Sequence, residues 1–373
     1  MTYLDSAATT FQKPPSVRAA MLRAVQTMSS PGRGGYASAR AAEELLFRTR
    51  TLAAETFGVA SPERVVFTAS ATHGLNVAIK SLVPRGGRAV ISGYEHNAVT
   101  RPLYALDAET AVAESPLFDA DACLRAFDRE LRRGADAAVC ATASNVFGCV
   151  LPIAEVAALC RRFRVPLIVD ASQSAGVLPL DMAALGAAFV AMPGHKGLYA
   201  PQGTGLLLCG ADAATLLEGG TGSASLEQAM PDFLPDRLEA GTHNVPGIAG
   251  LEAGLRYVRR MTPERIACHE RRLIRRAAEG LRRLSGVTVY ASEDAERQLG
   301  VLSFNVAGRE PEDVAEALAE RGIAVRAGYH CAPTAHRSAG TLPRGTVRAS
   351  VSAFSTDADV DALLRAMRAA LSK

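Results

Sequence analysis

The 373-residue chain lacks several features that mark specialised classes of protein. Its seven cysteines are odd in number and form no CxxC pair, which argues against a disulfide framework and a structural zinc site and favours a reducing compartment. No apolar run is long enough to cross a bilayer, and the start has no basic segment followed by an apolar core. The 41 basic and 38 acidic residues form no block of like charge, so no nucleic-acid or membrane surface is indicated. We therefore expect a soluble, cytoplasmic, globular protein without a metal site, whose ligands are small anions.

Short β-rich runs alternate with helical patterns between residues 60 and 210, which predicts an α/β fold with a parallel sheet covered on both faces. Residues 211–245 are rich in Gly, Ser and Pro without periodicity, which predicts an extended loop. The last eighty or so residues predict a small α+β domain, with the strands GVLSFNVAG, IAVRAG and GTVRASVSA. The strands expected in the first part are RVVFT, RAVISG, AAVCATA, PLIVD, AAFVAM and GLLLC.

Two neighbouring strand ends carry a carboxylate and an amine. The run PLIVD ends in Asp170, and the next run, AAFVAM, is followed closely by Lys196. Alone, Asp170 is more often a helix N-cap and Lys196 a solvated side chain. Together, at the rim where parallel sheets bind ligands, they match what a pyridoxal 5′-phosphate (PLP) enzyme needs. The amine forms a Schiff base, and the carboxylate keeps the pyridine nitrogen protonated.

The same rim offers a phosphate site and a flat side chain. Residues 68–82, TASATHGLNVAIKSL, predict a strand end, a small-residue turn and the start of an amphipathic helix, whose free N–H groups favour an anion. Ser70 or Thr72 could equally be an ordinary N-cap. His96 follows the strand RAVISG and can stack on a ring, although a lone histidine is more often structural.

Short motifs are spread along nearly the whole chain. They are LDSAATT (4–10), PGRGG (31–35), SATHGLN (70–76), EHNA (95–98), SNVFG (144–148), DASQSAG (170–176), GHKGLYAPQGTG (194–205), EAGTHN (239–244) and RAGYHCAP (326–333). In these motifs the chain resembles the class V, fold-type I PLP-dependent enzymes, and among them the cysteine desulfurase and selenocysteine lyase group. The resemblance implies a large domain over residues 16–245 with a mainly parallel seven-stranded sheet flanked by helices. It also implies a smaller α+β domain from residues 1–15 and 246–373, which carries a catalytic cysteine loop.

The resemblance also implies roles for single residues. Lys196 would hold the cofactor, Asp170 would face its ring nitrogen, and Gln173 would bind its ring hydroxyl. His96 would stack on the ring and shuttle protons. Ala71, Thr72 and His195 would contact the phosphate of the cofactor. Thr242 would contact the phosphate of the cofactor in a neighbouring subunit, which implies a homodimer. Asn145 and Arg348 would bind the substrate carboxylate. Two positions depart from the family pattern, because Pro193 and Ala71 stand where many relatives have hydroxyl residues that contact phosphate.

The sulfur chemistry rests on Cys331, which lies in a polar loop with Gly and Pro. Attack on sulfur needs a thiolate, and a cation such as Arg326, which we also place at the substrate site, lowers the pKa of a thiol. An exposed cysteine alone is seldom a nucleophile, but beside the other site residues this role is favoured. Cys140 and Cys209 lie in apolar runs and are expected to be inert. His330 and His336 flank the thiol, yet no further ligand has usable spacing for a metal.

We expect a PLP-dependent cysteine desulfurase that converts L-cysteine to L-alanine and leaves a persulfide on Cys331. The short loop before the strand of Arg348 resembles the group II enzymes, which implies a separate sulfur-acceptor protein. The alternatives are a selenocysteine lyase acting on L-selenocysteine, another class V aminotransferase or lyase reaction, and, remotely, a non-catalytic sulfur carrier. The sequence distinguishes neither sulfur from selenium nor the acceptor and the pathway served.

Overall fold

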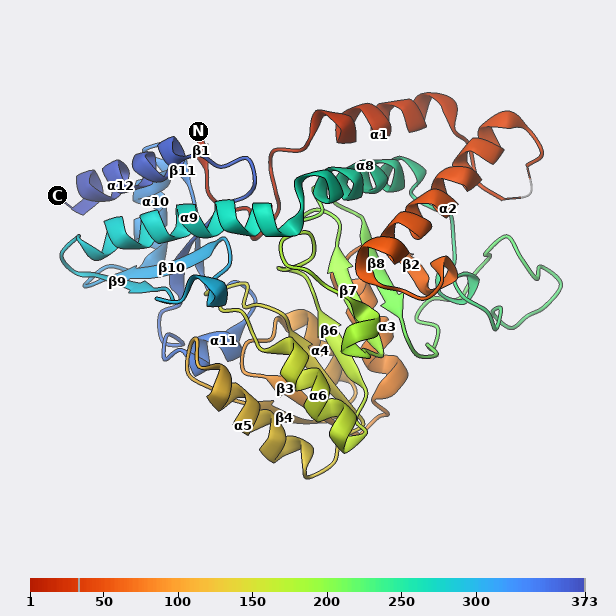
Figure 1. The fold of residues 1–373 in the computed structure, drawn as a ribbon, viewed down its shortest axis with the longest axis horizontal. Helices are drawn as coiled ribbons and strands as arrows, with labels where there is room; N and C mark the ends of the chain where they lie inside the picture. Colours follow the sequence, from red (N-terminus) through yellow and green to blue (C-terminus); the bar gives the residue numbers. More distant parts are fainter. Residues whose placement is uncertain (33, 372–373) are drawn as a thin grey trace.

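A computed structural model describes residues 1–32 and 34–371 and contains two large β-sheets with helices around them (Figure 1). Arg33, in the PGRGG motif, lies outside the described residues. Within the described part of the chain, no helix is both long and apolar enough to span a membrane.

The larger sheet has seven strands in the order β2-β8-β7-β6-β5-β3-β4. The five strands from β7 to β4 run parallel, whereas β8 is antiparallel to both β7 and β2. The mainly parallel seven-stranded sheet is thus confirmed. Strand β4 was not among the runs identified as strands. The bounds are β2 (Val65–Thr68), β3 (Arg88–Ser92), β4 (Glu109–Ala113), β5 (Ala137–Ala141), β6 (Leu167–Asp170), β7 (Phe189–Pro193) and β8 (Gly205–Cys209).

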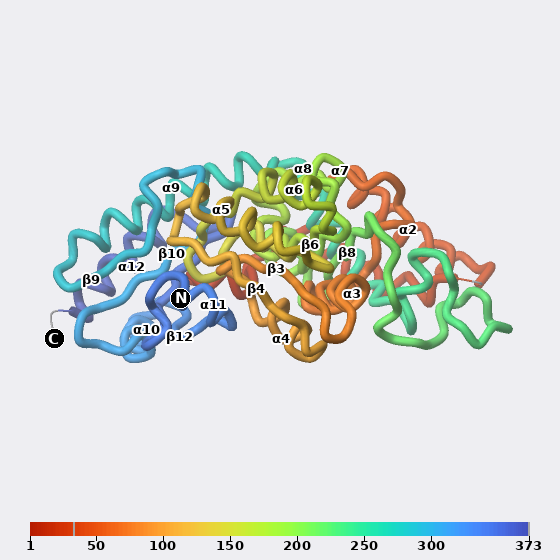
Figure 2. The backbone as a smooth tube through the Cα atoms, turned by 90° about the horizontal axis from the view of Figure 1, so that it is seen from below, coloured from red at the N-terminus to blue at the C-terminus, as the bar shows by residue number. Residues whose placement is uncertain are grey.

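Helices cover both faces of this sheet because alternate strand residues point to opposite sides. In β5, Ala138 and Cys140 join the core under one set of helices, and Ala137 and Val139 join the core under the other. Figure 2 shows the two helical layers on either side of the sheet. One layer contains α3 (Ala71–Leu82) and α4 (Asn97–Ala105), and the other contains α5 (Ala120–Leu131), α6 (Ile153–Phe163) and α7 (Met182–Leu185).

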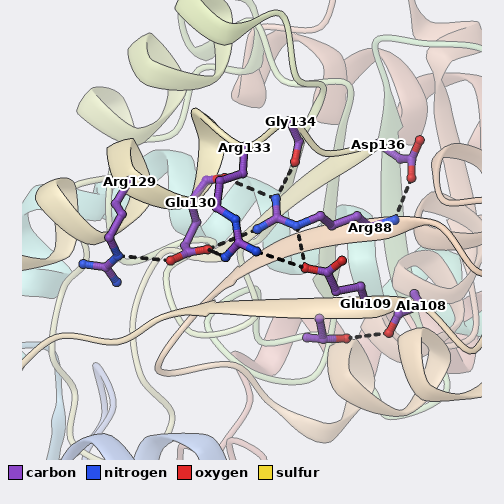
Figure 3. A network of polar contacts seen from close by, with 9 residues as sticks. Arg88, Ala108, Glu109, Arg129, Glu130, Arg133, Gly134 and Asp136 are labelled. Atoms are coloured by element: carbon purple, nitrogen blue, oxygen red, sulfur yellow. Dashed lines mark hydrogen bonds and ion pairs between the residues drawn. The ribbon is translucent and has the colours of Figure 1, made fainter.

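A group of ion pairs and hydrogen bonds stabilises the larger sheet at the amino ends of its strands (Figure 3). Arg88, at the start of β3, donates to Glu109 at 2.8 Å and to Glu130 at 3.1 Å. Its own backbone N–H donates to Asp136 at 2.7 Å, and Arg133 donates to Glu130 at 3.2 Å. These contacts join β3, β4 and the end of α5, so we assign them a structural role.

The second sheet is antiparallel, with strands in the order β12-β13-β10-β9. The three expected strands of this part are present, although the run IAVRAG is divided between β11 and β12, and β9 is additional. The N-terminal β1 pairs with β11, so the two ends of the chain meet here. The bounds are β1 (Thr2–Tyr3), β9 (Val287–Tyr290), β10 (Val301–Val306), β11 (Ile323–Ala324), β12 (Arg326–Gly328), β13 (Thr346–Ser350), α9 (Pro263–Arg282), α10 (Pro311–Ala319), α11 (Pro333–Ser338) and α12 (Asp357–Leu371).

Three further helices pack beside the larger sheet, where α8 lies against α1 and α2 (Figure 1). The loop expected over residues 211–245 is present and ends one residue earlier, where α8 begins. Residues 210–244 contain no regular element other than one short 3-10 helix. The bounds are α1 (Pro15–Thr27), α2 (Ala37–Phe57), α8 (Val245–Met261) and the 3-10 helices η1 (Pro62–Arg64), η2 (Asp236–Leu238) and η3 (Ala295–Arg297).

Candidate active site

A cavity of about 320 Å³ lies where the carboxyl ends of β6 and β7 meet the second sheet. This is the place at which open parallel sheets bind ligands. The cavity brings together every residue expected at the site except Thr242. Its lining includes Ala71, Thr72, His96, Asn145, Asp170, Gln173, His195, Lys196, Arg326, Cys331 and Arg348, together with Pro193 and His330.

Asp170 is the last residue of β6, and Lys196 lies in the turn that follows the adjacent parallel strand β7. Asp170 is 5% exposed, and one of its oxygens accepts the N–H of Ser172 at 2.9 Å. Burial lowers the pKa of Lys196 to about 8, and the charge of Asp170 opposes that change. The amine is therefore more easily deprotonated near neutral pH than an exposed lysine.

The turn that carries Lys196 is shaped by close backbone contacts. Thr10 donates its backbone N–H and its hydroxyl to the His195 carbonyl, both at 3.0 Å. A Cβ added to Gly197 would collide with the Ala175 carbonyl, so the chain can follow this path only without a side chain there. The LDSAATT segment and the GHKG turn therefore support each other.

The start of α3 and His195 form the other end of the cavity. Ser70 caps α3 by accepting the N–H of His73 at 3.2 Å, so the N-cap interpretation holds for Ser70. Ala71 and Thr72 follow in the first turn, where backbone N–H groups lack helical partners. Burial lowers the pKa of His195 to about 4, so its ring is neutral. Among the described residues, nothing pairs with its buried Nδ1.

His96 caps α4, and its Nδ1 accepts the N–H of Ala98 at 3.0 Å. A neutral ring in this bond carries its proton on Nε2. Burial lowers the pKa of His96, while the charge of Asp170 opposes that change. Gln173 donates to the carbonyl of Ala7 at 3.2 Å, which fixes it beside the same wall of the cavity.

Arg348, in β13, is 2% exposed and is held by two partners. It donates to the carbonyl of Asn145 at 2.9 Å and to Asp5 at 2.7 Å. The Nε of Arg348 has no partner within residues 1–32 and 34–371. The other oxygen of Asp5 accepts from Arg326 at 3.2 Å. The sequence reading missed Asp5, although it lies in LDSAATT and a buried arginine requires a carboxylate nearby.

Cys331 is exposed and lines the cavity, in the turn between β12 and α11. His330 and Cys331 both have positive φ, 50° and 56°, in the left-handed region that non-glycine residues seldom adopt. The turn is held by the N–H of Asn97, which donates to the Cys331 carbonyl at 2.7 Å, and by Asn145, which donates to the His330 carbonyl at 2.8 Å. Burial raises the pKa of Cys140 well above its usual value, as expected for an inert thiol.

Thr242 lines a different cavity of about 280 Å³, together with Phe67 and His73. The loop that carries it is anchored by the buried pair of Arg50 and Glu239, in which Arg50 donates at 2.7 Å. Glu239 also accepts the N–H of Phe67 at 2.6 Å. Thr242 therefore does not face the cavity of its own chain.

Comparison with known proteins identifies the family of the chain. Residues 2–363 match the model of the family described as aminotransferase class-V, and the chain belongs to that family. It is 34% identical to a probable cysteine desulfurase of Mycolicibacterium paratuberculosis, over 99% of this chain and 55% of that protein. It is 33% identical to a probable cysteine desulfurase of Methanothermobacter thermautotrophicus, over 97% of this chain and 92% of that protein. Within the family, the chain belongs to the cysteine desulfurases.

A solved structure leads to the same group. The apo structure of a cysteine desulfurase from Thermococcus onnurineus NA1 superimposes with a TM-score of 0.90 at 30% identity. The match covers 99% of this chain and 94% of that one. The chain thus spans nearly the whole of this relative but only 55% of the Mycolicibacterium protein.

Proposed function

We propose that the chain is a PLP-dependent enzyme that takes sulfur from L-cysteine, releases L-alanine and holds the sulfur as a persulfide on Cys331. The observation that carries this proposal is one cavity lined by Lys196, Asp170, Arg348 and an exposed cysteine. An amine, a carboxylate, a cation and a thiol are the four groups that such a reaction requires.

The residues of the cavity suit PLP. The carboxylate of Asp170 matches a protonated pyridine nitrogen, and the amine of Lys196 matches the aldehyde. The unpartnered Nδ1 of His195 and the first turn of α3 match the phosphate. When bound, PLP supplies an electron sink for negative charge that develops at the substrate Cα. Because Pro193 and Ala71 line the cavity without hydroxyl groups, we propose that backbone N–H groups and His195 carry more of the phosphate binding.

The chain's own residues account for substrate binding and proton transfer. Arg348, with its unpartnered Nε, binds the cysteine carboxylate together with Asn145, because a guanidinium fork matches two carboxylate oxygens. Lys196 takes the proton from Cα and returns it, since a pKa of about 8 leaves a useful share of the amine neutral. His96 and Gln173 orient the pyridine ring of the cofactor.

The sulfur step involves one bond made and one broken. The Cys331 thiolate attacks the sulfur of the substrate, an S–S bond forms, and the C–S bond breaks. The substrate carbon keeps the electron pair and takes a proton, which gives L-alanine and a persulfide on Cys331. Arg326 provides positive charge near the thiolate.

The assembly and its partners are part of the proposal. Because Thr242 faces away from its own cavity, we propose a homodimer in which it reaches the phosphate of the neighbouring subunit. Because Cys331 is exposed and followed directly by α11, we propose a short-loop, group II enzyme that passes sulfur to an acceptor protein. Separate cores on the two sheets support a division into two domains, for which we propose the bounds 16–245 and 1–15 with 246–373. Helix α8 counts against the boundary at residue 245, because its Leu251 and Leu255 belong to the core of the larger sheet. Seven free cysteines support a cytoplasmic location.

The test is to incubate the purified protein with L-cysteine and to measure alanine together with a persulfide on Cys331 by mass spectrometry. Cys331→Ala is expected to lose cysteine turnover and to keep the cofactor absorbance. Cys268→Ala, at the other exposed thiol, is the matched control and is expected to behave as the wild type. Alanine without a modified Cys331 would overturn the sulfur step, and faster turnover of L-selenocysteine would indicate a selenocysteine lyase.

A further inference from the structure

A second carboxyl group is buried behind the residues that line the site, one residue before His96. Glu95 has no exposed surface. Its Oε1 accepts the N–H of Ala141 at 2.7 Å and the hydroxyl of Ser92. Its Oε2 is also buried, and no described residue pairs with it. The proposed function gives this side chain no task.

The surroundings keep Glu95 uncharged. A carboxylate with one unpartnered oxygen inside a protein is far more costly than the neutral acid. Burial raises the pKa of Glu95 to about 8, the charge of Asp170 adds to this, and the two hydrogen bonds oppose it. The other titratable groups whose charges interact with it are Cys123 and Cys140, and burial raises the pKa of both thiols. At neutral pH, the carboxyl of Glu95 is therefore mostly uncharged.

Glu95 also joins the two halves of the site. Its carbonyl accepts the hydroxyl of Thr334, in α11, at 2.8 Å, and two residues further on Asn97 donates to the Cys331 carbonyl. Its side chain is held by Ala141, which stands opposite Asp170 in the pairing of β5 with β6. The turn from Glu95 to Asn97 thus lies between the cysteine turn and the strand that ends in Asp170.

We propose that Glu95 is a positioning residue whose uncharged carboxyl fixes this turn, and whose ionisation in alkaline solution places a second negative charge beside Asp170. The proposal rests on the proposed function, because it concerns the same site. A second negative charge stabilises positive charge nearby, so it raises the affinity of the Lys196–cofactor linkage for its proton. Glu95 then broadens the pH range over which the site holds that proton.

The test uses Glu95→Gln, which keeps the oxygen that accepts from Ala141 and stays neutral at every pH. The absorbance of the protein-bound cofactor is titrated from pH 6 to pH 10 without substrate. The absorbance of the variant is expected to match that of the wild type at pH 7. Its Lys196–cofactor linkage is expected to lose its proton at a midpoint that is lower by about one pH unit. Its kcat at pH 7 is expected to stay within about twofold of the wild type. Glu114→Gln, at an exposed acid beyond the end of β4, is the matched control and should cause no shift.

If the titration curves of the wild type and of Glu95→Gln coincide, the inference is overturned and the proposed function is left intact. A fall of tenfold or more in kcat for Glu95→Gln at pH 7 would also overturn it, because the neutral side chain would then be insufficient. A wild-type protein that binds no cofactor and shows no absorbance band would instead refute the proposed function itself. Glu95→Ala, which loses the bond to Ala141, is expected to lower kcat at every pH, and unchanged turnover in that variant would refute the positioning role.

Discussion

Replacing Glu270 with glutamine is expected to stabilise the protein, and the gain should grow with pH. Glu270 lies on α9, is 5% exposed, and faces a small cavity of about 30 Å³ beside Ser6, Gln173 and Ser352. Burial alone raises its pKa from the ordinary 4.5 to about 8. In the part of the chain that the structure describes, no group donates a hydrogen bond to this carboxyl, so its negative charge has no direct compensation.

The magnitude follows from the proton affinities of the two states. The unfolded chain releases this proton above pH 4.5, whereas the folded protein keeps it until about pH 8. Stability is therefore lost steadily between these values, by about 1.4 kcal/mol for each pH unit. Glutamine does not titrate, so the variant should match the wild type near pH 4.5. It should be more stable by about 3 kcal/mol at pH 7 and by about 5 kcal/mol above pH 8.

The assay is urea unfolding followed by circular dichroism at pH 5, 7 and 8.5, because the chain has no tryptophan for fluorescence. Protein and cofactor concentrations are kept equal, since binding and assembly shift apparent stability. Glu279→Gln, at an exposed position on the same helix, is the control and is expected to show no pH-dependent gain. Equal stability of Glu270→Gln and the wild type at pH 8.5, or a loss of stability, would refute the reasoning.

Three other outcomes can be measured directly. Asp5→Asn removes the charge that pairs with buried Arg348, so the free energy of unfolding, measured by urea titration, should fall by about 3 kcal/mol. An unchanged free energy of unfolding would show that the pair is not needed for stability. Gly176→Ala places a Cβ against the Gly197 carbonyl at a φ of 84°, so its melting temperature should fall by several degrees, and an unchanged melting curve would contradict the contact. Iodoacetamide should label Cys331 in the folded protein and reach the five buried cysteines only after unfolding, as peptide mass spectrometry can check.

The strands that position the site could be predicted because they are continuous apolar runs buried on both faces. Three others were missed for physical reasons: β1 has only two residues, β4 is a partly exposed edge strand that begins with Glu109, and β9 is only half-buried. The antiparallel direction of β8 was also missed, because apolar patterns do not encode strand direction. The length of the connection could have revealed it, since residues 194–204 are too few for a helical crossover.

The site residues that follow strand ends could be predicted, because the carboxyl ends of parallel strands converge. Asp170 and Lys196 belong to this class. Residues whose role depends on contacts between distant segments could not be predicted from the sequence. Asp5 meets Arg348 across the second sheet, and Glu270 and Glu95 differ from ordinary acids only in what surrounds them.

The bond between Asp5 and Arg348 joins two residues that are 343 positions apart. During synthesis, Asp5 leaves the ribosome long before Arg348 exists, so the arginine that we propose for carboxylate binding meets its partner only after residue 348 has been made. Contacts of such long sequence separation close late in folding, because loop entropy opposes them. A nascent chain can therefore complete the larger sheet while its pocket is still unfinished, and the pocket is completed only after the segment that carries Arg348 has left the ribosome.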